Sequence, residues 1–265
     1  MINWKVRLLR PDSHKRVSGI PGVIQCYFEE ALSSWQLTLV SPHNWDDKYE
    51  VLAERIKLSI MTGDSYEEEM LGYLSPKVCV QCWSVAEKSD TLLRAYSYID
   101  IDETGRNRSS PKAEGVLVRS TPRKLIKALY DGVKPAELKE RCYIGAVRYL
   151  THKKITDVIG DAITKDRLVF TRPFNRARLQ LLKRKEFRHE NEARLIVVGN
   201  SNDHDERLLR VDFDPNDVFD EVIFDPRLAL AERRERKAKA KGLGYEGEIG
   251  EWNLYTTPFL QVIVK

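Results

Sequence analysis

Hydrophobic and polar positions recur along the chain with two periods, which predict a mixture of helices and strands. Apolar residues three or four positions apart predict helices over residues 22–35, 49–61, 91–98 and 122–130. Alternating or continuous apolar residues predict strands over residues 4–9, 36–40, 78–85, 115–119, 143–150, 193–198, 208–211, 218–224 and 259–264. These elements are interspersed without a regular strand–helix–strand rhythm. The pattern therefore predicts an α+β fold with a mixed, mostly antiparallel sheet flanked by helices.

Length and composition favour one globular unit. The chain has 265 residues, of which 42% are hydrophobic and 32% charged, so it can bury a sizeable core. It contains no internal repeat and no clear linker. We therefore predict a single compact domain spanning residues 1–265, with a mobile polar loop at residues 100–114 and a charged helix at residues 228–241.

Charge and motifs narrow the class of protein. The net charge of +4 permits a nucleic-acid partner but does not require one. No apolar run approaches the roughly 20 residues of a membrane-spanning helix, and the N-terminus lacks the order of a signal peptide, so we expect a cytoplasmic protein without a membrane partner.

Cys79 and Cys82 have the spacing of half a zinc site, but no second pair exists, and no metal is expected. Phosphate-binding glycine loops and nucleophile elbows are absent from the sequence.

The densest positive charge lies between residues 167 and 194 and includes a predicted basic helix over residues 176–188. Such a cluster can contact the phosphates of a nucleic acid, or it can be a solvated helix face balanced by acidic neighbours. The nucleic-acid-binding candidates are Arg176, Arg178, Lys183, Arg184, Lys185 and Arg188.

Two carboxylates stand where this basic segment gives way to a strand. Glu190 and Glu192 are two residues apart, so they point to the same face when the backbone is extended. Mutual repulsion would raise the pKa of one of them, which suits acid–base chemistry. The alternative is a surface salt-bridge cluster with the neighbouring Arg188 and Arg194.

Several blocks resemble, in order, a bacterial family known as domain of unknown function 2971. These blocks are Ser-Pro-His-Asn-Trp-Asp-Asp-Lys-Tyr-Glu from residue 41, Val-Gln-Cys-Trp-Ser from residue 80, Leu-Leu-Arg-Ala-Tyr-Ser from residue 92, Gly-Val-Leu-Val from residue 115 and Lys-Glu-Phe-Arg-His-Glu-Asn-Glu-Ala-Arg-Leu from residue 185. The Glu-x-Glu-x-Arg segment in the last block is the most specific. The chain departs from the family at Asp46, Lys48, Leu93 and Ala95, where the family has Asn, Pro, Trp and His.

The order of the blocks is also similar to that of ADP-ribosyltransferases, which implies an enzyme that transfers ADP-ribose from NAD to a nucleic acid or protein. By this resemblance Glu192 and Glu190 are the catalytic candidates. Arg10 would clamp the pyrophosphate, Ser84 and Tyr96 would support the ribose and nicotinamide, and Arg194 would be a supporting partner. The implied setting is a bacterial toxin or a phage-defence effector.

Two other functions remain open from the residues alone. One is a non-catalytic nucleic-acid-binding or regulatory module that uses the basic face between Arg167 and Arg188. The other is a metal-dependent nuclease, in which hard oxygen ligands would gather around Mg²⁺. The nuclease candidates are Asp46, Asp47, Glu50, Glu190 and Glu192. The sequence leaves the oligomeric state open.

Overall fold

The computed structural model describes residues 17–19, 23–45, 47–52, 56–70, 78–86, 89–104, 113–199 and 208–255. The strands predicted over residues 4–9 and 259–264 lie outside the described residues, as does most of the predicted polar loop at 100–114. The organisation of residues 1–265 as a single domain therefore stays a prediction.

Ten strands of the described residues form one branched sheet in the order β12-β3-β6-β1-β7-β13-β14, with β11, β8 and β2 attached beside this path. Every pairing in this sheet is antiparallel except that of β13 with β14. The predicted α+β fold with a mostly antiparallel sheet is thus confirmed. The strands are β1 (Val17–Gly19), β2 (Val23–Ile24), β3 (Gln36–Val40), β6 (Val78–Ser84), β7 (Gly115–Ser120), β8 (Cys142–Ala146), β11 (Glu192–Val198), β12 (Leu208–Asp212), β13 (Glu221–Phe224) and β14 (Glu248–Ile249).

The centre of the sheet is the pair formed by β6 and β11. β11 pairs with β6 along its whole length, from Glu192 opposite Ser84 to Val198 opposite Val78. The other edge of β6 pairs with β1 at one end and with β3 at the other. All residues of β11 are buried, including the charged ones. The register therefore places the start of β11 beside the end of β6, in the middle of the sheet.

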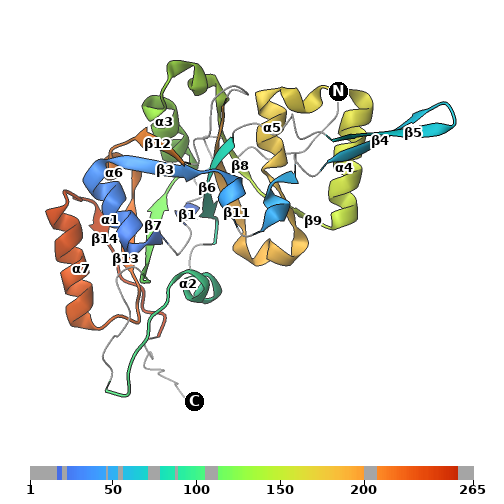
Figure 1. Cartoon of the computed structure of the whole chain (residues 1–265). Helices are drawn as coiled ribbons and strands as arrows, with labels where there is room; N and C mark the ends of the chain where they lie inside the picture. The colour runs from blue at the N-terminus through green and yellow to red at the C-terminus, as the bar shows by residue number, and fades with distance from the viewer. Residues whose placement is uncertain are drawn as a thin grey trace, which may run out of the picture.

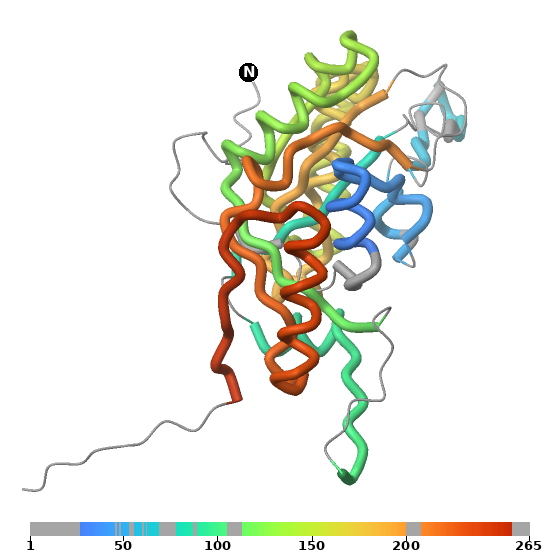
Figure 2. The backbone as a smooth tube through the Cα atoms, turned by 90° about the vertical axis from the view of Figure 1, so that its left-hand side faces the viewer, coloured from blue at the N-terminus to red at the C-terminus, as the bar shows by residue number. Residues whose placement is uncertain are grey.

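Helices cover the sheet, and their starts follow local sequence signals (Figure 1). The Thr121 hydroxyl accepts a hydrogen bond from the Lys124 amide, and Pro122 opens α3. The charged helix predicted at residues 228–241 is α7, which Figure 2 brings to the front. The helices are α1 (Gln25–Ser34), α2 (Asp90–Tyr96), α3 (Pro122–Gly132), α4 (His152–Lys165), α5 (Pro173–Leu179), α6 (Pro215–Val218) and α7 (Leu230–Gly242).

A second hydrophobic cluster, separate from the main core, joins α4 to α5. Ile155, Ile159, Phe170, Leu179 and Leu182 are buried in it. The short parallel strands β9 (Arg148–Leu150) and β10 (Leu182–Arg184) border this cluster. A hairpin of β4 (Lys57–Thr62) and β5 (Ser65–Met70) extends from it away from the rest of the molecule (Figure 1).

Two predicted helices are wrong. In place of a helix over residues 49–61, the chain forms a 3₁₀ turn at Lys48–Glu50 and then β4, because β4 pairs with β5 and Leu58 packs against the second cluster. In place of a basic helix over residues 176–188, α5 ends at Leu179 and is followed by β10 and a 3₁₀ helix at Lys185–Glu190. Here the pairing of β10 with β9 overrides the local helical pattern. The strand predicted over residues 143–150 is divided into β8 and β9.

Candidate functional site

Five charged side chains meet at the start of β11. We call them the charged cluster: Glu50, Lys183, Glu190, Glu192 and Arg194. Four of them are buried, whereas Glu190 is partly exposed. The left-handed backbone of Asn191, with φ of 46°, ends the 3₁₀ helix between the two glutamates and turns the chain into the sheet. The cluster therefore stands where an irregular segment enters a rigid strand.

Arg194 is the most enclosed member, with no exposed surface. Its guanidinium donates to both carboxylate oxygens of Glu50, at 2.8 and 3.0 Å, and through Nε to Glu192 at 2.6 Å. Nη1 also donates to the Gln180 carbonyl at 2.7 Å, and the guanidinium lies 5.1 Å from the centre of the Trp45 ring. Arg194 thus ties two other segments of the chain, residues 45–50 and Gln180, to β11 through bidentate and charge-assisted bonds.

Lys183 holds the remaining carboxylates together. Its ammonium donates to Glu190 and, at 2.7 Å, to Glu192, and it lies 3.2 Å from Oε1 of Glu50. Burial alone would lower the pKa of Lys183, but the charges of Glu192 and Glu50 raise it overall. The lysine therefore stays protonated at the centre of three carboxylates.

The environment of the cluster pushes the pKa values of the two glutamates apart. Burial and a hydrogen bond with Glu192 raise the pKa of Glu190 to about 7. Burial also acts to raise the pKa of Glu192, but the Arg194 guanidinium and the hydrogen bond from Glu190 lower it to about 2. Three carboxylates face only two cations, so the cluster is neutral when Glu190 carries a proton. One carboxyl is thus a permanent anion and the other titrates near neutrality, a pattern typical of acid–base sites.

This raised pKa predicts a pH-dependent stability. The unfolded side chain titrates near pH 4.3, so between that value and about 7 the folded state binds more protons. The Glu190 contribution to the free energy of unfolding should therefore fall as pH rises through this window, by up to about 3–4 kcal/mol. Urea unfolding of the Glu190→Gln variant should show a flatter pH dependence than the wild type. The exposed Glu186→Gln variant is the control, and equal slopes for the wild type and Glu190→Gln would contradict the assignment.

Ser84 and Tyr96 lie at the same place. The Ser84 hydroxyl donates to the Glu190 carbonyl at 2.8 Å and accepts from the Ala86 amide at 3.1 Å, so it is buried and fixes the backbone of the glutamate segment. Tyr96 is 37% exposed, and burial together with the charges of Glu190 and Glu192 raises its pKa to about 12. Ser84 therefore contacts the glutamate segment, and the charges of both glutamates act on Tyr96, whereas Arg10 lies outside the described residues.

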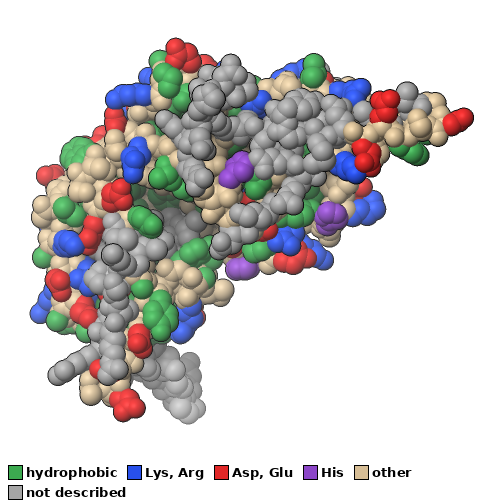
Figure 3. Space-filling view, in the orientation of Figure 1, with side chains coloured by type: hydrophobic (Ala, Val, Ile, Leu, Met, Phe, Trp, Pro, Cys, Tyr) green, Lys and Arg blue, Asp and Glu red, His purple; other side chains and the backbone are tan. Residues whose placement is uncertain are grey.

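The predicted basic face is divided by the fold. Arg176 and Lys183 are buried, and Arg178 is half-buried near the ring of Phe174. Arg184 donates to Asp47 at 2.9 Å and stacks near two aromatic rings. Of the six candidates, Lys185 and Arg188 are exposed. In Figure 3, basic and acidic side chains are interspersed over the face in view.

The carboxylates proposed for a nuclease do meet, but around cations of the protein. Glu50, Glu190 and Glu192 surround the Lys183 ammonium, and Asp47 pairs with Arg184. Asp46 lies outside the described residues. Among the residues that the structure describes, no group of three or more His, Cys, Asp or Glu side chains is arranged to hold a metal ion. No helix of the described part is long and apolar enough to cross a membrane.

Sequence reasoning missed two contributors to this site. Trp45 lies in the first block of the family resemblance, yet nothing local connects it to β11. The Tyr149 hydroxyl accepts a hydrogen bond from the Glu192 amide at 2.8 Å. Glu50 was predicted only as a nuclease ligand beside the two glutamates, and its pairing with Arg194 was not predicted. One signal was present in the sequence, because alternation along β11 puts Glu192 and Arg194 on the same buried face as Ile196. Charges on a buried face require partners, which the sequence did not identify.

Comparisons of the whole chain with protein-family models, with curated proteins and with solved structures find no match. The geometry of the charged cluster is therefore the basis for the function proposed below.

Proposed function

We propose that this chain is an ADP-ribosyltransferase-like enzyme that transfers ADP-ribose from NAD to a nucleic acid or protein in the bacterial cytoplasm. The observation that carries the proposal is the carboxyl pair at the start of β11. The Arg194 guanidinium keeps Glu192 an anion, and burial raises the pKa of Glu190 to about 7. Burial and the charges of both glutamates also raise the pKa of Tyr96. The resemblance of the sequence blocks to the domain of unknown function 2971 family and to ADP-ribosyltransferases supports the same proposal, and it implies a bacterial toxin or a phage-defence effector.

The chemistry needs one base and one region of negative charge. A lone pair of the acceptor attacks C1′ of the ribose while the bond from C1′ to the nicotinamide nitrogen breaks. The electrons of that bond go to the nicotinamide ring, which leaves as a neutral molecule. The acceptor gives its proton to the Glu190 carboxylate. Positive charge develops on the ribose during this step, and nearby carboxylates stabilise it.

The geometry favours different roles for the two glutamates. Glu192 is 5% exposed and holds both Lys183 and Arg194, so we assign it as a positioning residue. Glu190 is the more exposed carboxyl and has the pKa of a general base at neutral pH, so we assign it as the catalytic residue. Tyr96 is 37% exposed, so its ring is accessible for stacking on nicotinamide. Arg10 keeps the pyrophosphate-clamping role that the resemblance implies.

The two alternatives receive less support from the same contacts. A nucleic-acid-binding module would use the predicted basic face, but Arg176 and Lys183 are buried and do not belong to the surface. A metal-dependent nuclease would need Mg²⁺ where the Lys183 ammonium already neutralises the carboxylates. The exposed Lys185 and Arg188 lie next to Glu190 along the chain, so they suit contacts with a negatively charged acceptor.

The test is NAD turnover by the full-length protein. Wild-type protein incubated with NAD and a bacterial lysate should release nicotinamide and label a macromolecule with ADP-ribose, and digestion with nuclease or protease identifies its class. Glu190→Gln should lower the rate by about 10²–10⁴-fold, because the base is lost while the shape is kept. Glu192→Gln should also lower the rate, because Lys183 and Arg194 lose the carboxylate that holds them in place.

The matched control is Glu186→Gln, which changes an exposed carboxylate of the same 3₁₀ helix and should leave the rate unchanged. Wild-type protein without NAD turnover, or full labelling by both Glu190→Gln and Glu192→Gln, would overturn the proposal.

A further inference from the structure

The β4–β5 hairpin forms a projecting arm, which we define as residues 57–70. Its tip carries Met61 and Tyr66, which face each other across the hairpin and are each 69% exposed. The neighbouring Glu67 and Glu68 are also exposed. Figures 1 and 3 show that the arm extends away from the molecule and that acidic and hydrophobic side chains lie near its end. Two adjacent large side chains surrounded by charge are typical of the anchor of a protein interface.

The arm is also unusual in charge. It holds one lysine and four acidic residues, which gives −3 in a chain whose total is +4, so the remainder carries +7. A two-stranded hairpin has little stability by itself, and its outer edges present backbone groups that can pair with another surface. An acidic, partly apolar arm on a basic protein is therefore complementary to the protein that bears it.

A surface with the matching chemistry lies at the connection between α4 and α5. We define this α4–α5 patch as residues 165–174. Leu168 and Phe174 are 61% and 41% exposed there, and Lys165, Arg167 and Arg172 are exposed beside them. Asp166 pairs with Arg172 at 2.8 Å, so the net charge of the patch is +2.

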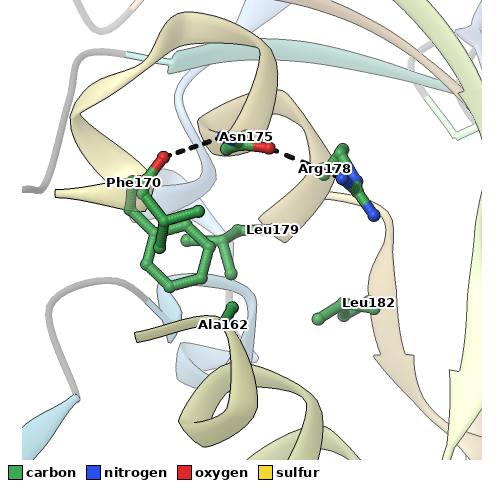
Figure 4. A pocket seen from close by; sticks show the side chains of 7 residues that line it. Ala162, Phe170, Asn175, Arg178, Leu179 and Leu182 are labelled. Atoms are coloured by element: carbon green, nitrogen blue, oxygen red, sulfur yellow. Dashed lines mark hydrogen bonds between the residues drawn. The ribbon is translucent and has the colours of Figure 1, made fainter. Parts of the chain in front are cut away.

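A pocket adjoins this patch (Figure 4). Its enclosed space has room for about one water molecule, so it is too small for a side chain. The Asn175 side chain donates to the Val169 carbonyl at 2.9 Å and borders the pocket with polar atoms. The lining is otherwise mainly apolar and includes Val169, Phe170, Leu179 and Leu182. The contact surface is therefore formed by the exposed Leu168 and Phe174, and an apolar surface among exposed cations can pack against an aromatic or thioether side chain with acidic neighbours.

We propose that two copies of this chain form a dimer in which the arm of each copy lies on the α4–α5 patch of the other. The Met61 and Tyr66 side chains pack against Leu168 and Phe174, while the arm carboxylates face the patch cations. Arm and patch both belong to the part of the fold around the second cluster, so one twofold axis can bring both contacts together. The resulting interface is isologous and closed, which prevents open-ended assembly.

Sedimentation velocity of the full-length protein tests this proposal. We expect a dimer at about 0.1 M salt that weakens at about 1 M salt, because screening shortens the reach of the arm–patch attraction. Tyr66→Ser should raise the dissociation constant by about thirtyfold, as the loss of a buried aromatic anchor does. Tyr98→Ser is the control, since Tyr98 is 67% exposed and lies outside both surfaces. Circular dichroism confirms that each variant is folded.

A charge exchange gives the sharper result. Glu67→Lys with Glu68→Lys should produce monomers, and so should Arg167→Glu with Arg172→Glu. The chain carrying all four changes should form dimers again, because the attraction is restored with its sign reversed. Any of three results would overturn the proposal. The wild type could be a monomer, Tyr66→Ser could leave the dimer unchanged, or the variant with all four charge changes could stay monomeric.

Discussion

Replacing Arg194 with methionine should lower the free energy of unfolding by about 3–5 kcal/mol. Methionine retains much of the length of the side chain, but it leaves the Glu50 and Glu192 carboxylates buried without their main counter-ion. It also leaves the Gln180 carbonyl without its donor. Removing one partner of a buried ion pair is far more destabilising than the pair itself is stabilising. Urea unfolding followed by circular dichroism measures the difference.

The control for this prediction is Arg172→Met. Arg172 also pairs with a carboxylate, but its side chain is 64% exposed, so its loss should change the free energy of unfolding by less than about 1 kcal/mol. A more demanding comparison replaces Arg194, Glu50 and Glu192 together with apolar residues. This triple variant should be more stable than Arg194→Met alone, because no buried charge is left unpaired. A loss below about 1 kcal/mol in Arg194→Met would show that the cluster is not the buried network described above.

Replacing Lys183 with methionine should destabilise the fold by a similar amount, and the loss should depend strongly on pH. Without the ammonium, Glu50, Glu190 and Glu192 face the single charge of Arg194. Their repulsion should raise carboxyl pKa values in the folded state above those of the unfolded chain. A group with a raised folded pKa stabilises the fold at low pH and loses that contribution as pH rises through the folded value. The variant should therefore be closest to the wild type near pH 5 and furthest from it near pH 8.

Lys185→Met serves as the control, because Lys185 is the exposed lysine next but one along the chain. It should change the free energy of unfolding by at most about 0.5 kcal/mol at either pH. If Lys183→Met lost the same stability at both pH values, the three carboxylates would not be responsible for the effect. The same variant should also raise the pKa of Glu190, and so move the pH profile of NAD turnover toward alkaline values.

The charged cluster is better explained by function than by stability. Moving five charged groups out of water is unfavourable, and an apolar core of the same volume is often at least as stable. Here the arrangement keeps one carboxyl as an anion and poises another near pH 7, beside an exposed tyrosine. Strongly perturbed titratable groups gathered at one place are typical of functional sites. This argument supports the proposed role of Glu190 independently of the family resemblance.

Local periodicity was enough for much of the fold. β3, β6, β7 and β11 were predicted from their apolar patterns, and α3 from the helical spacing of its apolar residues. These signals lie within a few residues of one another, so they can be read without knowing the neighbours in space. The pattern failed at β4 and β10. Both strands have partners that supply the hydrogen bonds, β5 and β9, and the helical spacing of their own residues gave no sign of that pairing.

For the candidate site too, some features could be predicted from the sequence and others could not. The sequence predicts that Glu190 and Glu192 stand at the entry to a strand, because the apolar run that follows them marks where the strand begins. Which groups meet them depends on the three-dimensional packing of the chain. Glu50 pairs with Arg194 although 144 residues separate them in the chain. Lys183 was predicted to lie on the basic face, but it is buried among carboxylates. Pairing between distant charges depends on packing and burial, which set the local electrostatics and are not encoded in any short stretch of sequence.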